Sequence, residues 1–196
     1  EMTWNLFEIL PIGLIVVVPA MIALSVWDRD ARWLKRLGWG WGLPLVALIV
    51  GPWAIAITIA TDGGFWTEAI GGDLAPKIAG GDEGHGVFPG FYLLIAPLLF
   101  FPATLMLPAA LSAGWSRRAE PAIRFLICWL VPAWLIFELT PTKLPHYNLP
   151  TFGALALLAA AALTRPVGKL SRQVGAGLTI AVGALLAVGS VWLLTE

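Results

Sequence analysis

A short polar segment between two apolar runs carries the side chains that are best suited to chemistry. It extends from Glu138 to Pro150 and contains Lys143, His146 and Tyr147. Prolines interrupt it at three positions: Pro141, Pro145 and Pro150. Because proline stops a helix and fixes its own backbone, we expect a rigid turn that holds the three side chains. A lysine ammonium group and a tyrosine hydroxyl can neutralise a departing phosphate, so the segment predicts a phosphate-binding site.

Glu138 lies near the end of an apolar run, where an ionised carboxylate is costly unless it has a partner or a function. This cost makes Glu138 a candidate substrate-binding residue beside Lys143, His146 and Tyr147. An alternative interpretation is structural: Lys143 pairs with Glu138 or extends to a lipid headgroup. Both interpretations stay open at the level of the sequence.

A second candidate segment, residues 61–87, is rich in glycine and has Asp82, Glu83 and His85 near its end. Glycine lets the backbone approach a ligand closely. An imidazole beside two carboxylates can bind a divalent cation, hydrogen-bond to a sugar hydroxyl or transfer a proton. The alternative is a flexible external loop in which His85 only packs. A divalent cation therefore stays an open question, and the sequence predicts no other cofactor.

The composition indicates that the chain is a membrane protein. Of 196 residues, 59% are hydrophobic and 12% are charged, and the mean hydropathy is +0.84. A soluble domain carries about 25% charged residues, so a water-soluble globular domain is excluded. Cations and anions number 12 each, which gives no reason to expect a nucleic-acid partner. The single cysteine, Cys128, excludes a disulfide framework.

Apolar runs of membrane length must position the polar segments. A helix needs roughly 20 apolar residues to cross the hydrocarbon core, and six runs approach this length: 9–27, 43–60, 88–111, 123–139, 149–163 and 174–194. We therefore expect an all-α fold, a polytopic transmembrane helical bundle of about six spanning helices in one domain, residues 1–196. The last run carries Gly177 and Ala181, a spacing that permits close helix contact.

The distribution of charge predicts the orientation of these runs. If the six runs alternate in direction, ten of the twelve cations fall in one set of loops, and the other set holds only Lys77 and Lys143. Positively charged loops tend to stay in the cytoplasm, so both termini and the loops 61–87 and 140–148 are expected on the outer, periplasmic face. Lys143 and His85 would then face the same compartment.

The stretch from Phe137 to Pro150, followed by Ala154 to Leu157, resembles bacterial membrane glycosyltransferases of the aminoarabinose-transferase and protein-mannosyltransferase type. Less specific similarities lie at Gly84 to Tyr92 and Gly42 to Trp53, so the resemblance covers most of the chain from about Gly13 onward. It implies part of a larger GT-C membrane domain. Such enzymes transfer a sugar from a polyprenyl-phosphate carrier to a lipid, glycan or protein acceptor.

By this resemblance, Lys143 and Tyr147 match motif positions beside the carrier phosphate, and His85 matches a loop histidine near the active cavity. The expected catalytic aspartate of the family lies outside this chain, so no catalytic residue is assigned. The resemblance suggests the C-terminal portion of the membrane domain, from a truncated gene, a fragmentary sequence or a split protein, and we expect the isolated polypeptide to be inactive. It also implies the bacterial inner (plasma) membrane and a role in lipid A modification.

A different class of protein stays open: a small non-catalytic membrane protein, such as a transporter half or a lipid-binding accessory subunit. Transporters usually carry ionisable groups near the bilayer midplane. The centres of the six runs contain none, and Glu138, Lys143 and His85 gather toward one surface. This arrangement favours chemistry on a lipid headgroup. Membrane lipids are expected partners in both classes.

Overall fold

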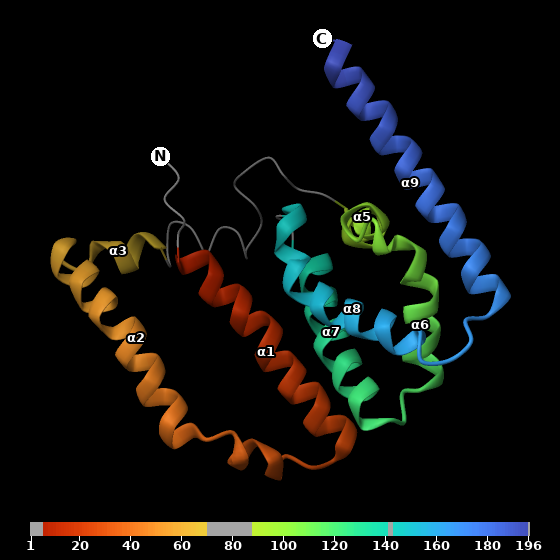
Figure 1. Ribbon diagram of the computed structural model, residues 1–196. Coiled ribbons are helices and arrows are strands. Elements are labelled where there is room, and N and C mark those ends of the chain that lie inside the picture. Colours follow the sequence, from red (N-terminus) through yellow and green to blue (C-terminus); the bar gives the residue numbers. More distant parts are fainter. Residues whose placement is uncertain (1–5, 70–87, 141–142, 196) are drawn as a thin grey trace.

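The computed structural model shows an all-helical chain and describes residues 6–69, 88–140 and 143–195 (Figure 1). No strand occurs in these ranges, so the expected all-α fold is confirmed. The helices, with 3-10 turns marked η, are α1 Leu6–Asp28, η1 Arg32–Arg36, α2 Trp39–Ala60, α3 Gly64–Thr67, α5 Phe91–Leu99, η3 Ala103–Met106, α6 Leu107–Ser116, α7 Pro121–Leu139, η4 Pro145–Asn148, α8 Leu149–Ala162 and α9 Lys169–Thr195.

Within the described ranges, three helices are long and apolar enough to cross a membrane: α2, α7 and α9. A fourth crossing results if α5 and α6 together form one broken span. The 14 residues of α8 extend only about 21 Å at 1.5 Å per residue, which is less than the hydrocarbon core. The described part of the chain is thus a helical membrane protein, and the count of six crossing helices stays a prediction.

The apolar run 88–111 is bent where the sequence predicts one continuous span. Its axis turns by 119° between α5 and the segment formed by η3 and α6. Pro102 lies in the break, and because proline has no amide hydrogen it cannot continue the hydrogen bonding of α5. The buried hydroxyl of Thr104 donates to the carbonyl oxygen of Pro97 at 2.6 Å. This bond satisfies one of the acceptors that the end of α5 leaves open.

The centre of the bundle is α7, which packs between α1 and α8 (Figure 1). Its buried side chains include Ile123, Leu126 and Leu130, spaced so that they lie on one face of the helix. They belong to one apolar cluster with Ala154 and Leu158 of α8. Residues of α6 join the same cluster, so α6, α7 and α8 form a packed unit that sets the position of the turn after α7.

The backbones of α9 and η3 approach closely where the two segments cross, and Gly175 allows this approach. A side-chain carbon at position 175 would lie 2.1 Å from the carbonyl oxygen of Leu105, whereas non-bonded atoms prefer about 3.5–4.0 Å. Only the hydrogen of glycine fits there. The spacing of Gly177 and Ala181 does not make this contact, because a carbon at Gly177 would meet no described atom within 4 Å.

In contrast to α7 and α9, α2 contains no buried residue. Its main neighbour in the described chain is α3, which follows its C-terminal end. There the indole N–H of Trp66 donates to the hydroxyl of Thr58 at 2.7 Å. A helix that is apolar around its whole circumference suits lipid surroundings.

Ion pairs hold three connections at one end of the bundle. Asp28, at the end of α1, pairs with Arg124 near the start of α7. Glu120, just before α7, pairs with Arg117 after α6 and with Arg165 after α8. The charge distribution predicts that this end is cytoplasmic. The start of α5 and the end of α7 lie at the opposite end (Figure 1).

Candidate functional site

The carboxylate of Glu138 closes the N-terminus of α5. It accepts hydrogen bonds from the backbone N–H groups of Gly90 and Leu93, each at 2.8 Å. The first N–H groups of a helix lack partners within the helix, and a negative charge is favourable there. Gly90 has a φ of +104°, which glycine adopts without strain, and this conformation lets the chain turn directly into α5.

This contact gives Glu138 a structural role as a cap of α5, which sequence reasoning did not identify. The side chain is only 8% exposed, and the indole N–H of Trp134 also points at it, at 3.4 Å. The carboxylate therefore joins the end of α7 to the beginning of α5. A direct contact between Glu138 and a substrate stays a prediction.

Tyr92 makes a second connection between α5 and the polar turn. Its buried hydroxyl donates to the carbonyl oxygen of Leu144 at 2.9 Å. Its ring packs in an apolar cluster with Val16, Ala133 and Phe137, and Tyr147 packs against this cluster. The sequence analysis missed Tyr92 as a site residue because its partner lies 52 positions away.

Lys143 lies in the turn after α7 and is only 4% exposed. Its Nζ donates to the carbonyl oxygen of Thr140, the residue that ends α7, at 2.7 Å. A cation is electrostatically favourable at the C-terminus of a helix. The burial does not fit a side chain extended toward lipid headgroups. The turn instead holds a positive charge inside the protein at the end of α7.

His146 and Tyr147 follow on η4. Their rings lie edge to face with centroids 5.0 Å apart, and His146 is exposed whereas Tyr147 is partly buried. Asn148 comes next and is fully buried. Its side-chain oxygen accepts from the hydroxyl of Thr151 at 2.8 Å, while its Nδ2 has no hydrogen-bond partner within the described ranges. The turn thus combines one buried charge, one exposed imidazole and a phenol.

The structure therefore brings four of the five predicted binding residues to one end of the bundle: Glu138, Lys143, His146 and Tyr147. The fifth, His85, lies outside the described residues, as do Asp82 and Glu83. Their relation to the turn stays a prediction. Across the described ranges, no group of three or more His, Cys, Asp or Glu side chains is placed to hold a metal ion.

The membrane-length helices, with a polar turn at the end of α7, define a helical membrane protein. Over 152 residues, 76% of its length, the chain is 35% identical to the undecaprenyl phosphate-alpha-4-amino-4-deoxy-L-arabinose arabinosyl transferase of Pseudomonas paraeruginosa. It is 34% identical over 187 residues, 90% of its length, to the undecaprenyl phosphate-alpha-4-amino-4-deoxy-L-arabinose arabinosyl transferase 1 of Sodalis glossinidius. The chain is therefore homologous to part of the aminoarabinose transferases, glycosyltransferases of the GT-C type, which confirms the resemblance.

The similarity covers a limited part of these relatives. The chain spans 27% of the Pseudomonas protein and 33% of the Sodalis protein. The whole transferases thus contain long regions without a counterpart in this chain. No family model matches the chain. No solved structure matches it either.

Proposed function

We propose that this chain forms part of a membrane glycosyltransferase that uses a sugar linked to a polyprenyl phosphate. The observation that carries the proposal is the homology to transferases named for undecaprenyl phosphate-aminoarabinose. The acceptor would be a lipid, glycan or protein outside the cytoplasm, with lipid A as one candidate. The protein would lie in the bacterial inner membrane, with the turn after α7 on the periplasmic side.

Within this chain, the turn after α7 would hold the phosphate of the carrier. Lys143 supplies a positive charge in a place with little water, where an ionic hydrogen bond is stronger than in solution. His146 and Tyr147 supply an imidazole and a phenolic hydroxyl beside it. When the bond between sugar and phosphate breaks, negative charge grows on the phosphate oxygens. Donors that are already in place stabilise that charge.

Glu138 and Tyr92 would act indirectly, by holding the turn against α5. Glu138 fixes the first turn of α5 to the end of α7, and Tyr92 fixes α5 to Leu144. These contacts hold the end of α7 and Leu144, on either side of Lys143 in the sequence, against α5. Such preorganisation matters because a displacement of about 1 Å is costly for a reaction.

Binding of undecaprenyl phosphate to the purified chain tests this proposal. The protein in detergent micelles is titrated with the lipid, and native mass spectrometry measures the fraction of protein that carries bound lipid. Lys143→Met removes the charge and nearly keeps the length of the side chain. We expect about tenfold weaker binding, because one charge-assisted hydrogen bond contributes about 1.5–3 kcal/mol. Tyr147→Phe, which removes one hydroxyl, should weaken binding less.

Lys35→Met is the matched control, because this exposed lysine lies in η1, on the predicted cytoplasmic side. It removes the same charge far from the turn and should leave the affinity unchanged. A photoreactive carrier analogue should label peptides that contain residues 143–147. Equal affinities of the wild type, Lys143→Met and Lys35→Met, with no labelling at this turn, would refute the proposed site.

A further inference from the structure

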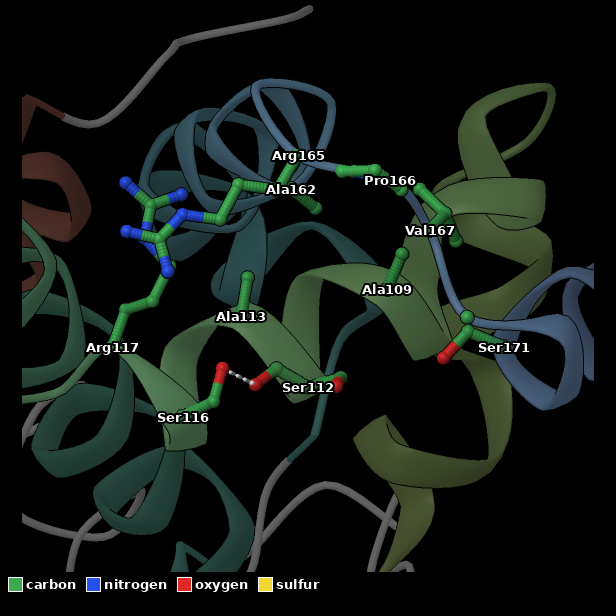
Figure 2. Close-up of a pocket in the computed structure, with 11 residues that line it drawn as sticks. Ala109, Ser112, Ala113, Ser116, Arg117, Ala162, Arg165, Pro166, Val167 and Ser171 are labelled. Atoms are coloured by element: carbon green, nitrogen blue, oxygen red, sulfur yellow. Dashed lines mark hydrogen bonds between the residues drawn. The ribbon is translucent and has the colours of Figure 1, made fainter.

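A polar pocket lies at the end of the bundle opposite to Lys143. It is formed where α6, the end of α8 and the start of α9 meet, and Figure 2 shows the side chains around it. Its volume is about 140 Å³. A single water needs only about 10–15 Å³, so the pocket has room for a group of several atoms. Its polar lining comes from two arginines and three serines: Arg117, Arg165, Ser112, Ser116 and Ser171.

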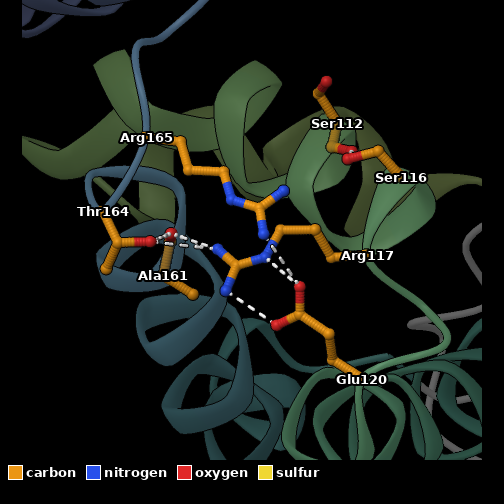
Figure 3. A network of polar contacts seen from close by, with 7 residues as sticks. All are labelled: Ser112, Ser116, Arg117, Glu120, Ala161, Thr164 and Arg165. Carbon is orange, nitrogen blue, oxygen red and sulfur yellow. Dashed lines mark hydrogen bonds and ion pairs between the residues drawn. The ribbon is translucent and has the colours of Figure 1, made fainter.

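The guanidinium group of Arg117 is fixed in the wall of this pocket. It donates to both carboxylate oxygens of Glu120, at 2.9 and 2.8 Å. It also donates to the carbonyl oxygen of Ala161 at 2.7 Å and to the hydroxyl of Thr164 at 3.1 Å (Figure 3). The hydrogen bonds from Arg117 to Glu120 hold the pKa of this carboxyl group below its usual range, because the adjacent guanidinium favours the ionised form. Arg117 therefore supplies an immobile positive charge.

Arg165 differs from Arg117 in its spare hydrogen-bonding capacity. Its side chain is 66% exposed and makes one ion pair, with Glu120 at 3.3 Å. A guanidinium group has five N–H donors, so most of those of Arg165 are available to a ligand. Two guanidinium groups share one carboxylate here, which leaves a net positive charge at the pocket.

The start of α9 adds further donors and a local excess of positive charge. The first hydrogen bond of the helix runs from the N–H of Arg172 to the carbonyl oxygen of Gly168, which lines the pocket. The N–H groups before Arg172 thus have no partner inside the helix. The first turn carries Lys169 and Arg172 and no acidic residue, although a helix N-terminus favours anions. A bound anion would balance this arrangement.

Hydroxyl groups complete the donor set. Ser116 donates to the carbonyl oxygen of Ser112 at 2.7 Å, as Figure 2 shows. The hydroxyls of Ser112 and Ser171 make no hydrogen bond to a described residue, so both are available to a ligand in the pocket. A forked guanidinium group, hydroxyls and helix N–H groups are the donors that bind phosphate oxygens.

We propose that this pocket binds a phosphate ester group at the predicted cytoplasmic surface of the membrane. The inference does not depend on the proposed glycosyltransferase function, because the pocket lies at the other end of the bundle. Two sources share this chemistry: the headgroup of an anionic lipid of the inner leaflet and a soluble phosphate compound. Arg165 and the start of α9 contact the phosphate. Arg117 holds the wall of the pocket in place through its bonds to Glu120 and Ala161.

The test measures lipid binding to the chain in detergent micelles by native mass spectrometry. Phosphatidylglycerol and phosphatidic acid are the lipid probes, inorganic phosphate is the soluble probe, and diacylglycerol is the control without phosphate. We expect one saturable site for at least one phosphate probe and about tenfold weaker binding by Arg165→Gln. Arg118→Gln is the matched control, because Arg118 lies beside the pocket over the ring of Trp115 and outside its lining. Lys143→Met should also leave this site unchanged.

A second variant separates loss of the site from loss of the fold. Ser171→Asp places a carboxylate in the first turn of α9, where it substitutes for a bound anion. We expect this variant to melt at a higher temperature in the absence of lipid and to lose the binding. Competition by inorganic phosphate would identify a soluble source, and its failure would identify a lipid headgroup. The proposal is overturned if no phosphate probe binds, or if Arg118→Gln weakens binding as much as Arg165→Gln.

Discussion

The carboxylate of Glu138 and the backbone nitrogen of Gly90 lie 2.8 Å apart, although 48 residues separate them along the chain. This bond and the one to Leu93 join the end of α7 to the beginning of α5. The polar turn with Lys143 starts directly after α7. The geometry of this turn therefore depends on a contact whose partners, Gly90 and Leu93, lie outside the polar segment. This dependence can be measured.

Glu138→Gln should destabilise the protein by about 1–3 kcal/mol. The amide keeps the shape of the side chain, but it turns an N–H group toward one of two backbone donors and removes the charge that favours a helix N-terminus. Thermal unfolding in detergent micelles, followed by tryptophan fluorescence, measures the effect. Glu68→Gln removes an exposed carboxylate outside this contact and should change stability by less than about 0.5 kcal/mol. Equal effects of the two variants would contradict the capping role.

Gly175→Ala and Gly177→Ala should shift stability in opposite directions. The added methyl group at position 175 meets the carbonyl oxygen of Leu105, and forced overpacking costs about 1–3 kcal/mol. The methyl group at position 177 meets no described atom within 4 Å, so the better helix propensity of alanine should add about 0.5–1 kcal/mol. Melting temperatures of the two variants check this. A tolerated alanine at position 175 would mean that α9 does not cross η3 as closely as described.

Glu120 should make the fold sensitive to acid. Hydrogen bonds from Arg117 lower the pKa of its carboxyl group in the folded state. The stabilisation is complete above the unfolded value of about 4.3 and is lost as the pH falls through the lower folded value. In melts at neutral and acidic pH, Glu120→Gln should therefore reduce the acid-induced loss of stability. Adding Arg117→Gln to this variant should change the pH dependence no further, whereas an unchanged acid response of Glu120→Gln would argue against the ion pair.

Cysteine labelling should place Lys143 and His85 on the same side of the membrane. In a background with Cys128→Ala, the variants His146→Cys and His85→Cys should react with a membrane-impermeant maleimide in intact cells. Arg118→Cys should react only after the membrane is opened, because it lies in a positively charged connection. Labelling of positions 85 and 146 from opposite sides would remove the basis for a shared carrier site.

The helical class and the family could be predicted from the sequence because both depend on local information. Composition and apolar runs indicate a membrane helix without knowledge of its neighbours, and the stretch around Lys143 carries the resemblance by itself. The bend in the run 88–111 was not predicted, because the run stays apolar through Pro102. Hydropathy carries no information on the direction of a helix axis.

The contacts that hold the site together could not be predicted, since they join distant positions. Glu138 was recognised as costly, yet nothing in the sequence indicated that backbone N–H groups after residue 88 would satisfy it. The small residues of the last run indicated Gly177 as a contact position, but the close approach uses Gly175, because η3 lies against the face of α9 that carries Gly175. Pairing of Arg117 and Arg165 through Glu120 likewise requires three connections to meet.

The absence of buried residues in α2 has a consequence for how that helix tolerates substitution. Because no residue of α2 is buried, the stability of this helix in the membrane depends on the transfer of its side chains from water to hydrocarbon. It depends little on close packing against other helices. Exchanges among leucine, isoleucine and valine should be nearly neutral at every angle around its axis. A charged residue should be costly at every angle near its middle, so a mutational scan of α2 would show a dependence on depth and no helical periodicity.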